Sequence, residues 1–195
     1  RDIAIKLLEI VGIPTPERII DSYPHELSGG MRQRVAVAIA ILNKPELIIA
    51  DEPTTALDAL TQLKLLRLFL DLKQSARATL LLITHNLGIV AELCDRVAIL
   101  YAGQIAEVAP TVEVFKKPLH PYTQGLLKAV PRIGTDEELY AIPGMLPNLT
   151  NPPSGCRFHP RCKFAMPICP TKKPALSEIE KDHFVACYLY HSEFP

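Results

Sequence analysis

The chain has 195 residues, enough for one domain with a sizeable core or for one domain and a small appendage. Hydrophobic residues make up 48% of the sequence and charged residues 22%, which excludes an intrinsically disordered chain. Lysine and arginine number 21, as do aspartate and glutamate, so the formal net charge is +0. A general electrostatic affinity for nucleic acid or for an acidic membrane is therefore unsupported. No apolar run approaches the roughly 18 residues of a membrane span.

The first half of the chain alternates helical and strand-like patterns. Apolar periodicity over residues 3–11 predicts a helix that ends at Gly12 and Pro14. Further helices are expected from about Met31 to Leu42, over Ala59 to Lys73, and in a short stretch that ends at Cys94. Continuous apolar runs predict three buried strands, which are Leu47–Ala50, Leu80–Ile83 and Val97–Tyr101. Buried strands separated by helices are typical of an α/β fold with a parallel sheet covered on both faces.

The second half is different in composition. From Pro110 onward the sequence is rich in proline, with turn signals every few residues, and four of the five cysteines lie in the last 40 residues. We therefore expect two regions, an α/β part over residues 1–106 and a small, irregular Pro- and Cys-rich extension over residues 107–195.

Polar residues follow two of the predicted strands directly. Asp51 and Glu52 end the first strand and His85 ends the second, and the carboxyl ends of parallel strands are where such sheets bind ligands. An Asp-Glu pair there suits phosphate hydrolysis, because Asp51 can hold Mg²⁺ while Glu52 orients or deprotonates water. A neutral His85 can hydrogen-bond a terminal phosphate or the water. A lone Asp-Glu pair more often only caps a helix, but the combination favours the chemical interpretation.

A small polar string precedes the helix expected from Met31. Ser28 is a good N-cap residue, and Gly29 and Gly30 let a ligand approach the backbone closely. The unpaired N–H groups and the dipole at a helix start attract phosphate. An ordinary capped helix is the alternative, and the string alone does not decide between the two.

Four longer strings carry a resemblance to a known family. In chain order they are Leu27–Arg34, Leu47–Pro53, Ala56–Asp58 and His85. They resemble the signature motif, the Walker B strand, the D-loop and the switch histidine of ATP-binding-cassette (ABC) ATPases, which are P-loop NTPases.

The resemblance implies roles for individual residues. Asp51 would assist Mg²⁺, Glu52 would be the catalytic base and His85 would contact the γ-phosphate of ATP. The residues expected to bind the nucleotide are Ser28, Gly29, Gly30, Gln33 and Asp58. The first three of these would contact ATP that is held by the opposite ATPase subunit.

The sequence also departs from the family pattern. Met31 stands where the family most often has Gln, although Gln33 and the backbone donors remain. No G-x-x-x-x-G-K-[ST] phosphate loop (Walker A) occurs in the chain. We therefore expect the sequence to be a fragment that begins inside the helical subdomain. On its own it should not hydrolyse ATP.

Two strings in the second region narrow the resemblance. Residues 115–123 and 155–162 look like the extension of ATPase subunits from oligopeptide and dipeptide transporters, the peptide and nickel importer subfamily. This resemblance implies a peripheral subunit on the cytoplasmic side of the membrane that energises import of di- or oligopeptides or a related substrate such as nickel. Its partners would be a second ATPase subunit, two permease subunits and, indirectly, a substrate-binding protein; no nucleic acid is expected.

The cysteines of the second region follow the pattern C-x5-C-x6-C-x17-C, formed by Cys156, Cys162, Cys169 and Cys187. Such a set can hold a [4Fe–4S] cluster, which tolerates irregular spacing. Structural Zn²⁺ is the alternative, although it usually takes closer pairs, and the cysteines can also be reduced and metal-free. Disulfides are unexpected in a cytosolic protein. Some members of the resembled subfamily carry an iron–sulfur cluster in this extension.

Two other classes of function stay open at this level. One is a soluble ABC ATPase acting on nucleic acid or ribosomes, against which the neutral charge and the importer-like extension argue. The other is a metal- or redox-binding regulatory module.

Overall fold

The computed structural model describes residues 1–55, 57–75, 78–131 and 140–190. Contacts divide the chain into two compact units, Arg1–Leu93 and Cys94–Pro195, and each is described by itself. The expected boundary between residues 106 and 107, drawn from composition and resemblance, stays a prediction. No helix within the described residues is long and apolar enough to cross a membrane.

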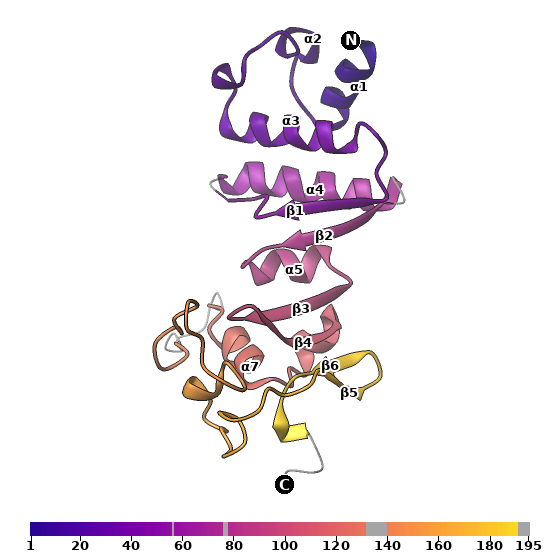
Figure 1. The fold of residues 1–195 in the computed structure, drawn as a ribbon. Coiled ribbons are helices and arrows are strands. Elements are labelled where there is room, and N and C mark those ends of the chain that lie inside the picture. The colour runs from indigo at the N-terminus through magenta and orange to yellow at the C-terminus, as the bar shows by residue number, and fades with distance from the viewer. Residues whose placement is uncertain (56, 76–77, 132–139, 191–195) are drawn as a thin grey trace. The chain divides into compact units, whose positions relative to one another are not determined.

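The first unit begins with a helical layer (Figure 1). Its elements are α1 (Asp2–Ile10), α2 (Pro16–Ile19), the 3₁₀ turn η1 (Pro24–Glu26) and α3 (Gly29–Ile41). Gly12 ends α1 with φ +71°, and a Cβ there would lie 2.6 Å from the guanidinium of Arg34. That guanidinium donates to the carbonyls of Val11 and Gly12 at 2.9 and 3.0 Å, so it caps α1 and ties it to α3. The predicted end of the first helix and the predicted second helix are confirmed.

The rest of the first unit is a small parallel sheet with two helices (Figure 1). Strands β1 (Leu47–Asp51) and β2 (Thr79–Ile83) pair in register from Leu47↔Thr79 to Asp51↔Ile83. The helices are α4 (Ala59–Ser75) and α5 (Leu87–Leu93). One face of β1 buries Ile48 and Ala50. The opposite face is exposed by 47 to 61% at Leu47, Ile49, Leu81 and Ile83, so the expected cover of both faces is not met within the described residues.

The second unit contains an antiparallel sheet of order β3-β4-β6-β5. Its strands are β3 (Arg96–Tyr101), β4 (Gln104–Pro110), β5 (Ser177–Glu180) and β6 (His183–Val185). The predicted third strand is therefore present as β3, but it pairs with β4 and not with the parallel pair β1-β2. Ala102 and Gly103, with φ of 48° and 76°, form the two-residue turn between β3 and β4.

The extension is more regular than its proline content suggests. It contains α6 (Thr111–Lys116), α7 (Pro121–Lys128) and the 3₁₀ turns η2 (His159–Arg161) and η3 (Tyr188–Tyr190). A hydrophobic core forms where β3 and β4 meet these helices, through Ile99, Ala109, Val114, Tyr122 and Leu126. The loops coloured orange in Figure 1, residues 140–176, are irregular apart from η2, as the composition predicts.

His120 begins α7 as its N-cap. Its Nδ1 accepts a hydrogen bond from the Tyr122 N–H at 3.0 Å, and the residue is only 3% exposed. Burial disfavours the imidazolium and lowers the pKa of His120 from 6.5 to about 4, against the opposing charge of Glu107. The ring is therefore neutral in the folded protein at neutral pH.

This burial predicts a specific loss of stability in acid. Between pH 6.5 and 4 the unfolded chain binds a proton at His120 that the folded chain does not, so folding weakens as the pH falls. His120→Asn keeps an N-cap acceptor but cannot titrate. We expect the wild type to lose about 2.5 kcal/mol more than His120→Asn between pH 7.5 and pH 4.5. Urea denaturation of both proteins at the two pH values measures this difference, and parallel losses would contradict it.

Candidate active site and cysteine cluster

The paired strands bring Glu52 and His85 together. Asp51 lies opposite Ile83 in the register, and the Glu52 N–H donates to the Ile83 carbonyl at 2.9 Å, which extends the pairing by one residue. Nδ1 of His85 lies 2.8 Å from Oε1 of Glu52. The sequence predicted that an acid pair and an imidazole would meet at one edge of the sheet, and the structure places them so.

A third side chain completes the surroundings of Glu52. The Thr55 hydroxyl donates to Oε2 of Glu52 at 3.1 Å, while the Thr55 N–H donates to the Glu52 carbonyl at 3.2 Å within the same turn. The bonds from His85 and, secondarily, Thr55 hold the pKa of the Glu52 carboxyl below its usual range. Glu52 is thus an ionised acceptor with both oxygens engaged. Its φ of +45° lies in the left-handed region that non-glycine residues rarely adopt.

The predicted phosphate-binding string lies at the start of α3. Ser28 is the N-cap, and its Oγ accepts from the Met31 N–H at 3.3 Å. Gly29 has open space where a Cβ would stand. At Gly30 a Cβ would lie 2.6 Å from Cγ2 of Thr61 in α4. The two glycines therefore differ: one leaves the backbone accessible, and the other permits close packing of α3 on α4.

The other predicted site residues of the first unit take different places. Asp51 is exposed at the end of β1. Asp58 precedes α4, and its Oδ1 accepts from the Thr61 N–H at 3.0 Å. Hydrogen bonding from Thr61, first by its side chain and then by this N–H, lowers the pKa of the Asp58 carboxyl. Nε2 of Gln33 donates to the Thr55 carbonyl at 3.4 Å. Ala56, the first residue of the predicted D-loop, lies outside the described residues.

The four cysteines of the extension gather in one part of the second unit. The Cys156 N–H donates to the Cys169 carbonyl at 2.8 Å. Gly155 makes this approach feasible, because a Cβ at its φ of +64° would lie 2.2 Å from the same carbonyl oxygen. None of the five cysteines forms a disulfide. The N–H of Met166 lies 3.4 Å from Sγ of Cys169 and points a donor at that sulfur.

Burial and mutual repulsion favour protonated thiols at Cys156, Cys162 and Cys187. Burial raises the pKa of Cys156 and Cys162, and it raises the pKa of Cys187 to about 12. A smaller contribution at Cys187 comes from the other three thiols, so all four lie within electrostatic range of one another. Within the described residues, no group of three or more His, Cys, Asp or Glu side chains is arranged to hold a metal ion. The expected cluster or zinc site therefore gains no direct support here.

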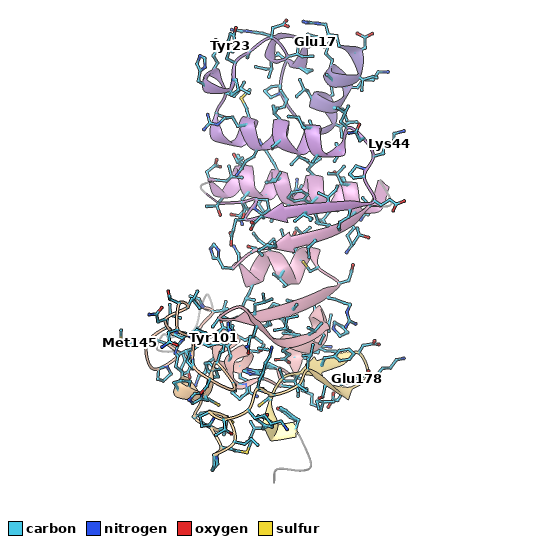
Figure 2. The ribbon with its side chains drawn as sticks, in the orientation of Figure 1. Glu17, Tyr23, Lys44, Tyr101, Met145 and Glu178 are labelled. Carbon is cyan, nitrogen blue, oxygen red and sulfur yellow. The ribbon has the colours of Figure 1, made fainter. Side chains whose placement is uncertain are left out.

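Aromatic packing fixes the cysteine loops onto the sheet. The ring of Tyr101, labelled in Figure 2, lies 4.7 Å from that of Tyr122 and 5.1 Å from that of Phe158. Arg161 donates to the Tyr101 hydroxyl at 3.3 Å and to the carbonyls of Ile142 and Pro143 at 2.9 Å each. The loops that carry Cys156 and Cys162 thus rest on β3 and α7.

Sequence reasoning missed two functional features. Thr55 follows the Asp-Glu pair in a Thr-Thr doublet, and nothing in the pattern indicates which hydroxyl reaches Glu52. Glu107 is a fully buried carboxylate in β4, and its signal was a single charge inside the apolar run Ile105–Ala109.

Family models match both halves of the chain. The model described as ABC transporter matches residues 1–55. The model described as the C-terminal region of oligopeptide/dipeptide transporters matches residues 106–169. The two matches fall on the regions that carry the signature string and the Pro- and Cys-rich extension.

Curated relatives match nearly the whole chain. The chain is 48% identical to the oligopeptide transport ATP-binding protein OppD of Bacillus subtilis over 194 residues, 98% of the chain and 54% of that protein. It is 47% identical to the dipeptide transport ATP-binding protein DppD of Caldanaerobacter subterraneus, over 92% of this chain and 56% of that protein. A probable peptide ABC transporter ATP-binding protein of Sinorhizobium fredii is 49% identical, over 95% of this chain and 56% of that protein. The chain thus spans about half the length of these relatives.

A solved structure supports the fold. A metal-chelate type ABC transporter in an inward-facing conformation aligns with a TM-score of 0.55 and 28% identity, covering 65% of this chain and 47% of that one. Fold, motifs and relatives agree, and the chain belongs to the oligopeptide/dipeptide transporter family of ABC ATPases.

Proposed function

We propose that this chain is part of the ATP-binding and ATP-hydrolysing subunit of an importer for dipeptides or oligopeptides. The observation that carries the proposal is the ionised Glu52, held between His85 and Thr55 at the end of β1, in a chain of this family. The printed names of the relatives, which describe peptide transport, support the substrate class. They favour it over a soluble ATPase acting on nucleic acid or over a regulatory module.

The start of α3 fits a phosphate group. Oγ of Ser28 accepts from the Met31 N–H, so the proton of this hydroxyl remains to be donated outward. The open space at Gly29 lets a ligand oxygen approach the backbone N–H groups at the positive end of a 13-residue helix. We propose that Ser28, Gly29 and Gly30 bind the γ-phosphate of ATP on a second ATPase subunit.

Glu52 is suited to act as the general base. Its lowered pKa keeps the carboxylate ionised at neutral pH, ready to accept a proton from an attacking water. With Nδ1–H of His85 donating to Oε1, Nε2 of the ring would accept from that water if it carries no proton. A contact from His85 to a phosphate oxygen would instead need a proton on Nε2. Asp51, exposed beside Glu52, would hold Mg²⁺, which when bound neutralises phosphate charge.

The proposed assembly has two ATPase subunits, two permease subunits and, indirectly, a substrate-binding protein. The chain would lie at the cytoplasmic side of the membrane, and closure of the ATPase pair would drive the permeases. Because the 195 residues contain no Walker A string, we propose that they turn over no ATP without further residues that supply it.

Peptide uptake in the producing cell tests this function. Deletion of the gene is expected to abolish uptake of labelled di- or oligopeptides, and the tagged protein is expected to copurify with two membrane permeases. Complementation with the wild-type gene should restore uptake. Normal uptake in the deletion strain, together with sedimentation of the protein with ribosomes, would replace the importer by the soluble class.

We also propose that Cys156, Cys162, Cys169 and Cys187 hold a [4Fe–4S] cluster, with Zn²⁺ as the alternative. The electrostatic proximity of the four thiols and the Met166 N–H directed at Cys169 support a shared site. The cluster would cross-link loops that otherwise have little core.

Metal analysis of anaerobically purified protein tests the cysteine site. We expect about four irons and four acid-labile sulfides per chain, together with a visible absorption band. Cys156→Ser should lose this content, whereas Cys94→Ser, outside the set, should keep it. One zinc per chain would select the alternative, and metal-free protein after anaerobic preparation would overturn the proposal.

A further inference from the structure

The Glu52 carboxylate is linked through Thr55 to the helix that begins with the signature string. The Thr55 side chain donates to Oε2 of Glu52 at 3.1 Å, and its backbone carbonyl accepts from Nε2 of Gln33 at 3.4 Å. Gln33 lies in the second turn of α3, four residues after Gly29. One residue thus contacts the candidate base with its side chain and α3 with its main chain.

A second contact joins the same two segments. A Cβ at Gly30 would lie 2.6 Å from Cγ2 of Thr61 in α4 and 3.7 Å from Cδ2 of Leu57, which precedes that helix. Thr55 therefore touches α3 at Gln33, while Leu57 and Thr61 lie next to it at Gly30. A shift of α3 relative to β1 would have to move these contact residues or break the Gln33 bond.

Gln33 itself is only partly satisfied. Its Nε2 makes the long bond to Thr55, while its Oε1 is buried without a hydrogen-bond partner within the described residues. A buried acceptor without a donor is costly, so this arrangement is one of the weaker points of the structure. The Gln33 amide is therefore suited to making a different set of bonds when α3 engages a nucleotide.

We infer that Thr55 is a positioning residue for Glu52 and that Gln33 couples it to α3, so that the position of the signature helix sets the placement of the catalytic carboxylate in the same subunit. This inference rests on the proposed function. It assigns Gln33 a place in the protein's own framework instead of the nucleotide contact expected from the motif. Both oxygens of Glu52 are held, one by His85 and one by Thr55. A displacement of Thr55 that follows α3 through the Gln33 bond would therefore displace the carboxylate as well.

Four single variants in the assembled transporter test the link. Thr55→Val removes the hydroxyl but keeps the shape and the backbone carbonyl, and Thr55→Ser restores the hydroxyl. Gln33→Met removes the amide from a chain of similar length. Thr54→Val is the matched control, since it removes the neighbouring hydroxyl, whereas the hydroxyl that donates to Glu52 is that of Thr55.

We expect Thr55→Val to lower kcat about tenfold with the KM for ATP unchanged, as loss of one hydrogen bond to a charged group predicts. Thr55→Ser and Thr54→Val should behave like the wild type. Gln33→Met should lower kcat, and the double variant with Thr55→Val should be no slower than Thr55→Val alone.

Several results would overturn the link. These are a multiplicative loss in the double variant, a kcat of Thr55→Ser as low as that of Thr55→Val, or equal losses in Thr54→Val and Thr55→Val. If Thr55→Val fails to fold, Gln33→Met with normal kcat would be decisive against coupling. Glu52→Gln distinguishes failure of the proposed function from failure of the link. Full ATPase activity in Glu52→Gln would contradict the proposed function. An inactive Glu52→Gln together with wild-type rates in Thr55→Val and Gln33→Met would contradict only the link.

Discussion

Glu52→Gln is expected to slow ATP hydrolysis by the assembled transporter by at least about 100-fold, the range that a positioned general base contributes. The amide has the size of the carboxylate, and its oxygen can still accept from Nδ1 of His85, so the turn should keep its form. It cannot accept a proton from water. ATP binding should be unchanged, because Glu52 holds no phosphate in this proposal. Single-turnover hydrolysis and equilibrium ATP binding, measured on the same preparation, separate the two effects.

Glu46→Gln is the matched control for this variant. Glu46 is exposed and immediately precedes β1, five residues before the end of that strand. The substitution removes one negative charge, as Glu52→Gln does, at a position away from the site. Its hydrolysis rate should stay within about twofold of the wild type. A Glu52→Gln protein that hydrolyses ATP as fast as Glu46→Gln would show that another group accepts the proton.

Much of the first unit could be predicted from sequence because its signals are local. The apolar runs Leu47–Ala50 and Leu80–Ile83 are too short and too continuous for surface helices, and the intervening stretch has a helical period. Parallel pairing then places the two carboxyl ends together, which is why Glu52 and His85 could be expected to meet. The Thr55 contact could not be predicted from sequence, because it depends on the left-handed φ of Glu52 and the turn that follows.

The second unit was less predictable because its order is non-local. Strand β4 pairs with β6 through Glu107↔Val185, across nearly eighty residues of mostly irregular chain. The pairing of β3 with β4 shifts register between Ile99 and Leu100, which blurs the alternation of buried and exposed residues. High proline content correctly indicated the irregular loops of residues 140–176, but it gave no indication of the antiparallel sheet against which these loops pack.

A buried carboxylate organises this second unit. Glu107 is fully buried, and its two oxygens accept from the Leu119 N–H at 2.8 Å and the His120 N–H at 2.9 Å. Nε2 of His183, itself 1% exposed, lies 2.6 Å from Oε1. One side chain in β4 therefore holds both the start of α7 and strand β6.

Glu107→Ala is accordingly expected to lower the free energy of unfolding by about 3–5 kcal/mol, the cost of removing one partner from a buried charged network. The variant leaves three buried donors, at Leu119, His120 and His183, without their acceptor, and it also leaves a cavity. Glu107→Gln should lose less, because one oxygen still accepts while the new NH₂ group faces a backbone N–H. Urea denaturation at pH 7.5 gives all three free energies.

The control for this loss is Glu113→Ala, which removes a carboxylate of the same type from the exposed side of α6. Its effect should stay within about 0.5 kcal/mol, as for other surface substitutions. The free energy of unfolding should decrease in the order wild type, Glu113→Ala, Glu107→Gln, Glu107→Ala. This order is expected only if burial and the three donors determine the loss of stability. Equal effects of Glu107→Ala and Glu113→Ala would mean that β6 and α7 are held by apolar packing instead. The Glu107 carboxylate would then be a tolerated charge whose donors find other partners when it is removed.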